Sequence, residues 1–428
     1  LGYGPRPMVS KLLDAVGRAP ESHTTAVFCL APTGYGKSTA TAPLAYYLTT
    51  SESPLGERAI HVLPMKSIVE DLYGRLGQKL RELGVSAGAQ AMMLLDTWKT
   101  PFFLARMVYT TLDSFTMNFF KLPVAELGKQ YMHYEIPRYA IYSSVVAFDE
   151  AHLMTGRKAY TAMAATLTAL TEAGSLVLVL TATLPDHMLK SILEHIAGRK
   201  QVIKLGMREL TKQSGDITWI HVEDREFMEE SEKADIKTII VDEATAAKAA
   251  VDHTSAGQPT LIVLNTVSRA IDFYRKLADK GVEVHLLHSR LTQGDRQAAV
   301  EAVRRALAER RGVCLVSTQV VEAGVDLDFD VLITDAAPAP QLVQRAGRVI
   351  RHIHEREKRG LPLQGSVYII RGGGHGVYSR EETERALSEV EKAELVHWKP
   401  ALHERGLPAE KLVEASTAPL QLDDILYV

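Results

Sequence analysis

Short apolar runs alternate along this chain with segments of helical periodicity, and this alternation constrains its fold more than any other feature. The runs are mostly continuous, which is typical of parallel strands that helices cover on both faces. They lie at residues 25–31, 59–64, 145–150 and 175–182, and again at 260–265, 282–288, 312–318, 330–335 and 366–370. We therefore expect an α/β protein with two parallel-sheet units in its 428 residues.

The boundary between the two units is expected within residues 206–236. The segment 222–236 carries seven acidic residues, which suits a solvated linker or an exposed helix face. A glycine-rich stretch at 371–376 precedes a charged tail of helical pattern, which we interpret as a small third element. The predicted domains are residues 1–210, 211–372 and 373–428.

Composition excludes several classes of protein. The 49 basic and 52 acidic residues leave a net charge of −3, so a strongly basic nucleic-acid binder is excluded, although a local basic groove is not. The chain contains no run of 18 apolar residues, which is the length needed to cross a bilayer, and its N-terminus lacks the layout of a signal peptide. Cys29 and Cys314 lie in apolar runs and are interpreted as buried structural thiols. We expect a cytoplasmic protein with no membrane partner.

The most specific motif is FCLAPTGYGKSTA at residues 28–40. Glycines allow backbone N–H groups to surround phosphate oxygens, Lys37 can reach the β- and γ-phosphates, and the Ser38 hydroxyl can ligate Mg²⁺. Ala31 stands where the full pattern has its first glycine. An ordinary strand–helix turn is the alternative to a phosphate loop. The predicted nucleotide-binding residues are Thr33, Gly34, Tyr35, Gly36, Lys37, Ser38 and Thr39.

A second apolar run ends in Asp149-Glu150-Ala151-His152. Acidic residues at the carboxyl end of a parallel strand lie where ligands collect in open α/β sheets. We expect Asp149, with Ser38, to hold Mg²⁺, and Glu150 to polarise an attacking water. An exposed helix N-cap is the alternative interpretation.

Three further stretches carry polar residues at strand ends or on helices. The first ends in Thr181-Ala182-Thr183, which is either a relay between two sites or a simple strand end. The second, residues 317–338, contains Thr318, Glu322, Gly324 and Asp326. The third, residues 341–360, places Arg345, Arg348 and Arg351 three residues apart, which predicts one side of a helix. It is interpreted either as a solvated basic helix or as a set of arginine fingers.

Taken in this order, the five motifs resemble the superfamily-2 helicase motor over roughly residues 25–370. Within that superfamily the chain is most similar to the CRISPR-associated helicase of type I interference systems. The stretches that carry this resemblance are residues 261–277, 286–297, 317–338 and 341–351. The resemblance implies two RecA-like lobes in tandem that bind ATP and Mg²⁺.

The resemblance also implies roles for individual residues. Lys37, Asp149 and Glu150 would act on ATP, Arg348 and Arg351 would be the arginine fingers, and Arg345 would brace the cleft between the lobes. Asp326 would meet the ribose, and His152, Thr181, Thr183 and Gln344 would couple hydrolysis to domain closure. The implied nucleic-acid contacts are Pro64, Lys66, Thr111, Asp113, Thr181, Thr183, His288, Ser289, Arg290 and Thr318.

Two departures from the family pattern stand out. The glutamine that reads adenine is not evident, because the matching stretch is Arg6-Pro7-Met8. No His-Asp dipeptide of the family's nuclease domain occurs in the chain.

We therefore expect a stand-alone, ATP-dependent helicase that translocates on single-stranded DNA. It would unwind target DNA opened by an RNA-guided surveillance complex, while a separate HD-type nuclease subunit cuts it. The alternatives are an RNA or DNA-repair helicase outside CRISPR immunity, and an ATP-gated module that recruits a nuclease without unwinding.

Overall fold

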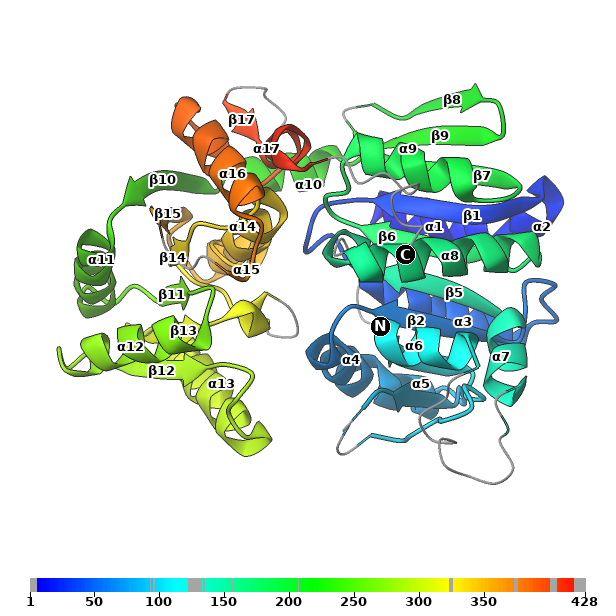
Figure 1. Cartoon of the computed structure of the whole chain (residues 1–428), viewed down its shortest axis with the longest axis horizontal. Coiled ribbons are helices and arrows are strands. Elements are labelled where there is room, and N and C mark those ends of the chain that lie inside the picture. The colour runs from blue at the N-terminus through cyan, green and yellow to red at the C-terminus, as the bar shows by residue number, and fades with distance from the viewer. Residues whose placement is uncertain are drawn as a thin grey trace. The chain divides into compact units, whose positions relative to one another are not determined.

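The computed structural model divides the chain into two compact units (Figure 1). It describes residues 6–92, 94, 97–121, 133, 135–154, 157–206, 208–322, 326–372, 376–400 and 406–418. The first unit runs to Asp224, and the second comprises Arg225–Ala418. None of the described helices has the length and apolar character needed to span a membrane.

The first unit is built on a nine-stranded sheet of order β3-β4-β2-β5-β6-β1-β7-β9-β8. All pairs are parallel except β8 with β9. Its strands are β1 (Thr24–Leu30), β2 (Arg58–Leu63), β3 (Ala87–Gln90), β4 (Met107–Thr111), β5 (Ser144–Asp149), β6 (Val177–Thr181), β7 (Arg199–Gly206), β8 (Leu210–Ser214) and β9 (Ile217–Glu223). The four predicted strands are the adjacent centre β2-β5-β6-β1, where burial on both faces favours continuous apolar runs.

Helices cover both faces of this sheet (Figure 1). They are α1 (Pro7–Gly17), α2 (Ala19–Ser22), α3 (Thr41–Thr50), α4 (Lys66–Leu72), α5 (Gln78–Glu82), α6 (Leu112–Phe119), α7 (Glu135–Tyr142), α8 (Arg157–Glu172) and α9 (Asp186–His195). A π-helical turn, Tyr73–Gly77, joins α4 to α5, and 3₁₀ turns lie at Lys37–Ala40 and Ala151–Leu153. Phe28, Phe115 and Phe148 are fully buried in the core beneath α6 and α8.

The second unit contains a parallel six-stranded sheet of order β10-β15-β14-β11-β13-β12. Its strands are β10 (Asp235–Val241), β11 (Thr260–Val263), β12 (Val284–Leu287), β13 (Cys314–Ser317), β14 (Val331–Asp335) and β15 (Gln364–Ile370). Its helices are α10 (Arg225–Glu232), α11 (Glu243–Ser255), α12 (Val267–Ala278), α13 (Gln293–Ala308), α14 (Ala339–Ala346), α15 (Ile353–Lys358), α16 (Arg380–Lys392) and α17 (Ala409–Ser416), with a 3₁₀ turn at Gln319–Val321. Two buried clusters pack on the sheet, and the predicted α/β fold with two parallel-sheet units is confirmed.

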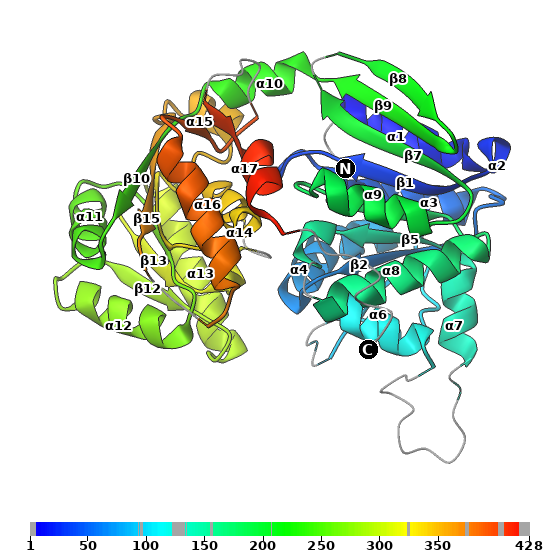
Figure 2. The same cartoon turned by 45° about the horizontal axis from the view of Figure 1, so that its top comes forward.

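The structure differs from the predicted domain boundaries in two places. The first unit ends at Asp224 and not at residue 210, because β9 pairs with β7 and thereby extends the first sheet. The segment 373–428 is not a separate element over its described part. Val390, Trp398 and Leu412 belong to the core of the second unit, to which α16, α17 and the short strands β16 (Val396–His397) and β17 (Leu407–Pro408) therefore contribute (Figure 2).

Candidate functional site

The loop after β1 has the backbone conformation that a phosphate cradle requires. Gly34 and Gly36 adopt φ values of 82° and 101°, which side chains disfavour. Lys37 is only 4% exposed, and its ammonium donates to the carbonyls of Ala31 at 2.5 Å and Pro32 at 2.9 Å. Lys37 is therefore fixed at the mouth of the loop, with its charge available to an anion held by the loop's N–H groups.

Asp149 ends β5 and is held by a buried histidine that the motif search missed. The two ring nitrogens of His61, on β2, form hydrogen bonds with Thr41 Oγ1 at 2.9 Å and with Asp149 Oδ2 at 3.0 Å. Both His61 and Asp149 are fully buried. Burial alone would raise the pKa of the Asp149 carboxyl, but the hydrogen bond with His61, with help from Ser38 and Lys37, lowers it below the usual value. Asp149 is therefore kept ionised.

Ser38 and Asp149 meet at one point, since the Ser38 hydroxyl hydrogen-bonds the Asp149 carboxylate. A hydroxyl and an ionised carboxylate are the hard oxygen ligands that Mg²⁺ prefers. The donor set of this site therefore fits the predicted magnesium ion.

Glu150 and His152 follow Asp149 on a tight turn. Glu150 adopts a left-handed φ of 52°, and its Oε2 lies 3.5 Å from His152 Nε2. The other ring nitrogen of His152 lies 3.2 Å from Thr181 Oγ1 at the end of β6. Burial and then the charge of Lys37 lower the pKa of His152 to about 3, so its imidazole is neutral at working pH. The turn thus connects the carboxylates to β6.

Tyr35 anchors the phosphate loop through its side chain. It is buried, and its hydroxyl donates to Asp224 Oδ2 at 2.7 Å and accepts from the Met8 N–H at 3.3 Å. The Arg6 guanidinium lies 5.4 Å from the Tyr35 ring centroid. The stretch Arg6-Pro7-Met8, where the family's glutamine was expected, therefore packs against the loop. Thr33 and Ser38 are half-buried, and the Thr39 hydroxyl donates to the Gly36 carbonyl at 2.7 Å.

The predicted nucleic-acid residues of the first unit follow the carboxyl ends of adjacent strands. Leu63, which precedes Pro64, is opposite Thr111 in the pairing of β2 with β4. Thr111 caps α6 by accepting from Ser114 N at 3.4 Å, Asp113 is exposed, and Lys66 lies 3.4 Å from Glu70.

The two threonines after β6 differ from their predicted role. Thr181 is fully buried beside His152, so it cannot touch a nucleic acid, although its coupling role stays open. Thr183 is 8% exposed, and its hydroxyl lacks a hydrogen-bond partner among the described residues.

The second unit also brings predicted residues together at strand ends. Thr318 follows β13, and its N–H donates to the carbonyl of Leu287, which precedes His288, at 3.2 Å. Burial and the charge of Arg290 lower the pKa of His288. Ser289 and Arg290 are exposed beside this pair. The residues expected to hold nucleic acid thus share one edge of the sheet.

The prediction that three arginines share one side of a helix is wrong. α14 ends at Ala346, Val349 pairs with Phe329 in a β-bridge, and Ile350 has a left-handed φ of 47°. Only Arg345 lies on that helix. Arg348 and Arg351 lie on the irregular segment that follows it.

Arg345 lies inside the second unit and does not brace a cleft. It is fully buried, and its guanidinium makes five hydrogen bonds within 3.3 Å. The acceptors are Glu322 Oε1, Thr334 Oγ1, the Asp335 carbonyl, Asn265 Oδ1 and Tyr378 Oη. A guanidinium that is buried and saturated in this way serves the core, so we withdraw the catalytic role of Arg345.

Arg348 and Arg351 contact Glu322 and Asp326. Arg348 donates to the Glu322 carbonyl at 2.7 Å, and Arg351 lies 3.2 Å from Asp326 Oδ1. Hydrogen bonding to His352 and the charge of Arg351 lower the pKa of Asp326 against the effect of burial. Gln344 on α14 is 6% exposed, and Gly324 lies outside the described residues.

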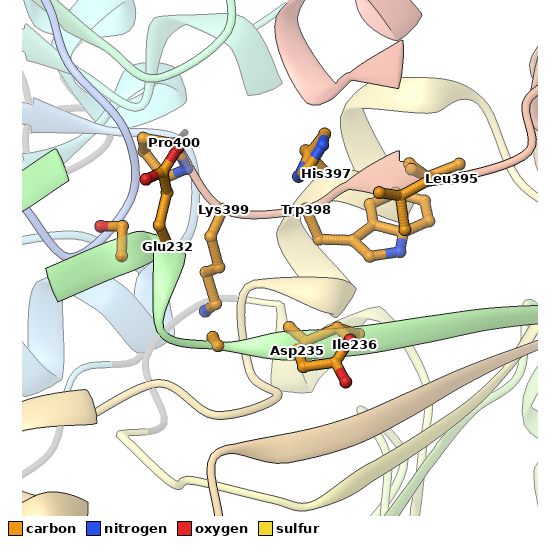
Figure 3. Close-up of a pocket in the computed structure, with 11 residues that line it drawn as sticks. Glu232, Asp235, Ile236, Leu395, His397, Trp398, Lys399 and Pro400 are labelled. Atoms are coloured by element: carbon orange, nitrogen blue, oxygen red, sulfur yellow. The ribbon is translucent and has the colours of Figure 1, made fainter. Parts of the chain in front are cut away.

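The second unit also contains a pocket of about 460 Å³ that no predicted residue lines (Figure 3). It lies between the start of β10 and the strand that precedes Pro400. Lys399 extends from that strand toward the turn before β10, and its ammonium donates to the Gly347 carbonyl at 3.2 Å. Burial and then Arg351 lower the pKa of Lys399 to about 7. The lining residues are Ser231, Glu232, Ala234, Asp235, Ile236, Leu395, Val396, His397, Trp398, Lys399 and Pro400.

Two of the functional residues in the first unit were missed by sequence reasoning. His61 and Thr41 form the hydrogen-bonded chain to Asp149, yet they lie 88 and 108 residues from it in the sequence. The available signal was a lone histidine inside the apolar run AIHVLP, because a buried polar side chain requires partners.

Comparisons with known proteins support the predicted resemblance. Residues 15–192 match the DEAD/DEAH box helicase family, and residues 256–354 match the C-terminal domain of the CRISPR-associated nuclease/helicase Cas3. The chain is therefore similar to the superfamily-2 helicases that are associated with CRISPR, which confirms the resemblance that the motifs predicted.

Individual relatives agree with this assignment. The CRISPR-associated helicase Cas3 of Thermoproteus tenax is 27% identical over 84% of this chain and 62% of its own length. The endonuclease/helicase Cas3 of Escherichia coli is 25% identical over 88% of this chain and 46% of its own length. The structure of T. fusca Cas3 with ADP has a TM-score of 0.70 and 19% identity, over 97% of this chain and 52% of that chain.

The chain spans less than two thirds of the length of these relatives, and about half of the matched structure. Among the described residues, no group of three or more His, Cys, Asp or Glu side chains could hold a metal ion.

Proposed function

We propose that this protein is an ATP-dependent translocase on single-stranded DNA that unwinds target DNA in type I CRISPR interference. The observation that carries the proposal is the convergence of Lys37, Ser38 and Asp149 at one edge of the first sheet, where Asp149 is kept ionised by His61. A recruitment module without turnover would not need Lys37, Glu150 and Arg348 together.

The residues of the first unit divide the work on ATP. The loop N–H groups and Lys37 hold the phosphates and balance the negative charge that develops in the transition state. Glu150, on the turn after Asp149, positions and polarises the attacking water. His152 is neutral and is therefore expected to transmit a movement of Glu150 to Thr181 on β6 without transferring a proton.

Ser38 and Asp149 would hold the Mg²⁺ that accompanies ATP. When bound, this ion neutralises charge on the phosphate oxygens. The second unit would contribute Arg348 and Arg351, whose guanidinium groups stabilise transition-state charge on the nucleotide that the first unit binds. Asp326 would contact the ribose.

The nucleic acid is proposed to follow the strand ends that carry Pro64, Lys66 and Thr111 in one unit and His288 and Thr318 in the other. Thr183 is kept in this set, although its hydroxyl is buried and would have to become accessible when the strand binds. Such contacts to the sugar–phosphate backbone position the strand without reading sequence.

The proposed partners follow from the named relatives. A matched structure is that of a CRISPR RNA-guided surveillance complex before nicking, with a TM-score of 0.64 to this chain. We propose that this protein also acts with an RNA-guided surveillance complex in the cytoplasm. A separate HD-type nuclease subunit is proposed to supply cleavage.

The proposal is tested by ATP turnover of the full chain with single-stranded DNA, single-stranded RNA, duplex DNA or no nucleic acid, followed by strand displacement. Lys37→Ala should abolish turnover, and Glu150→Gln should bind ATP but hydrolyse it at least a hundredfold more slowly. Lys190→Ala, on an exposed position of α9, is the matched control and should behave as wild type.

Three results would overturn the proposal. ATP turnover by Lys37→Ala close to that of wild type would show that the loop around Lys37 is not the ATP site. Stimulation by RNA alone would replace DNA as the substrate. DNA-stimulated turnover without translocation or strand displacement would favour an ATP-gated recruitment module.

A further inference from the structure

Trp98 presents a large aromatic side chain to solvent although its backbone is held on both sides. The residue is 53% exposed. Its N–H donates to Tyr73 Oη at 3.0 Å, and its carbonyl accepts from the Ala89 N–H at 2.8 Å. Arg81 fixes Tyr73 in turn, because its guanidinium donates to the same hydroxyl at 2.7 Å and lies 5.3 Å from the ring centroid. An indole on a fixed backbone loses little conformational freedom when it binds a ligand.

The segment that carries Trp98 pairs with β3, and its register places Trp98 level with Gly88, which is opposite Val108 and three residues before the level of Thr111. Lys99 pairs with Ala89 of β3 in a parallel bridge, and β3 pairs with β4 so that Gln90 is opposite Thr110. The Thr110 hydroxyl donates to the Gln90 carbonyl at 2.6 Å, and Thr111 is the next residue. Since neighbouring strands are about 4.8 Å apart and rise about 3.3 Å per residue, Trp98 lies roughly 14 Å across the sheet from β2 and roughly 10 Å along it from the level of Thr111, which several nucleotides can span.

The charge of this region is slightly basic. Residues 57–113 contain seven Lys and Arg and six Asp and Glu, a net charge of +1 within a chain whose net charge is −3. Lys99, next to Trp98, is exposed, and Met92, which follows β3, is 67% exposed. Single-stranded nucleic acid combines phosphate charge with flat apolar bases, and therefore matches both properties of this surface.

We propose that Trp98 is a stacking platform for one base of a single-stranded nucleic acid. The proposal rests on the proposed function, in which nucleic acid follows the strand ends at Pro64 and Thr111. It adds a base contact to an interface for which backbone contacts alone were predicted. Stacking tolerates any sequence, because every base has a π-face.

The experiment measures the affinity of the full chain for a fluorescein-labelled oligothymidylate of twelve nucleotides and for an abasic strand of the same length. Trp98→Ala should weaken binding of the oligothymidylate by about 5- to 150-fold, since stacking contributes roughly 1–3 kcal/mol per base. Binding of the abasic strand should not change, because the phosphates are the same.

Two variants serve as controls. Trp98→Phe retains an aromatic face and should keep most of the affinity for the oligothymidylate. Tyr139→Ala removes a side chain on α7 that is 70% exposed but lies outside the row of strand ends, and it should bind as wild type does. ATP turnover without DNA and the thermal unfolding midpoint should be equal in all four proteins.

Equal affinity of wild type and Trp98→Ala for the oligothymidylate would overturn the platform. An equal loss of affinity for the abasic strand would overturn it as well, because the effect would then not involve a base. If oligothymidylate stimulates ATP turnover of wild type and the half-saturating concentration is unaltered in Trp98→Ala, only the platform fails. If no nucleic acid stimulates wild type, the proposed function fails.

Discussion

Replacing Arg345 by methionine should strongly destabilise the second unit. Arg345 Nε lies 2.7 Å from Glu322 Oε1, and the two side chains are 0% and 4% exposed. Methionine fills much of the same volume but leaves the Glu322 carboxylate buried without its countercharge. Removing one partner of a buried ion pair typically costs about 3–5 kcal/mol. We expect a loss in this range, with the hydrogen bonds to Thr334 and Asn265 included in it.

The loss should depend on pH with a defined sign. Burial already raises the pKa of Glu322, and Arg345 opposes this rise. Without Arg345 the folded state therefore binds a proton more readily than the unfolded state. Stability of the variant is then greatest at low pH and falls as the pH rises above the unfolded pKa of Glu322. The difference from wild type should be smaller at pH 5 than at pH 8.

Urea unfolding followed by the fluorescence of Trp398 measures this effect in the second unit. Trp98→Phe and Trp219→Phe remove the other two tryptophans, so that Trp398, which is 4% exposed, is the single reporter. A loss of about 4 kcal/mol should lower the midpoint by roughly 1–2 M.

Two further variants test the cause. Glu322→Gln added to Arg345→Met should recover part of the loss, because the buried charge is gone. Arg304→Met breaks the pair with Glu301, whose side chains are 57% and 56% exposed, and should cost less than about 1 kcal/mol. A loss for Arg345→Met no larger than that for Arg304→Met would refute the reasoning.

Three other substitutions test the candidate ATP site and the pocket that Lys399 lines. His61→Phe removes the hydrogen bond that lowers the pKa of Asp149, so ATP turnover should fall, and fall further as the assay pH is lowered from 8 to 6. Arg348→Ala should lower kcat about a thousandfold with little change in KM for ATP, and a change in KM alone would contradict a finger role. Lys399 has a folded pKa of about 7, below its usual 10.5, so its charge costs stability fully below pH 7 and less as the pH rises. The free energy of unfolding of Lys399→Met, relative to that of wild type, should therefore be highest below pH 7. Urea unfolding should show this advantage decreasing steadily between pH 7 and 10.

The strands that sequence reasoning identified are mostly buried along their length, although β12, at the edge of the second sheet, is only partly buried at three of its four residues. In the first unit they are the adjacent strands β2, β5, β6 and β1, and in the second they are every strand except β10. The missed strands lie toward the edges of the two sheets, although β4 among them is largely buried. β8 reads LTKQS and is exposed at all five residues, so it has no apolar pattern to detect. Its position depends on pairing with β9, which is a tertiary contact.

The candidate site was predictable where its chemistry lies within one short peptide. Lys37, Ser38, Asp149 and Glu150 follow directly from their strands, and the sheet order then brings β1 and β5 to either side of β6. His61 was not predictable in the same way, because its role comes from partners that the sheet places beside β2.

The arginines show how a correct spacing can still mislead. Three residues apart, Arg345, Arg348 and Arg351 satisfy a helical period, but the period says nothing about where the helix ends. The bridge between Val349 and Phe329 takes the chain out of the helix after Ala346, and Asp328 then accepts from the Arg351 N–H at 2.8 Å. Arg345 is thereby buried as part of the core. Arg348 and Arg351 lie on a segment that is held by Asp328 and Phe329, just before β14. The same three side chains therefore separate into one that stabilises the fold and two that remain candidates for acting on ATP.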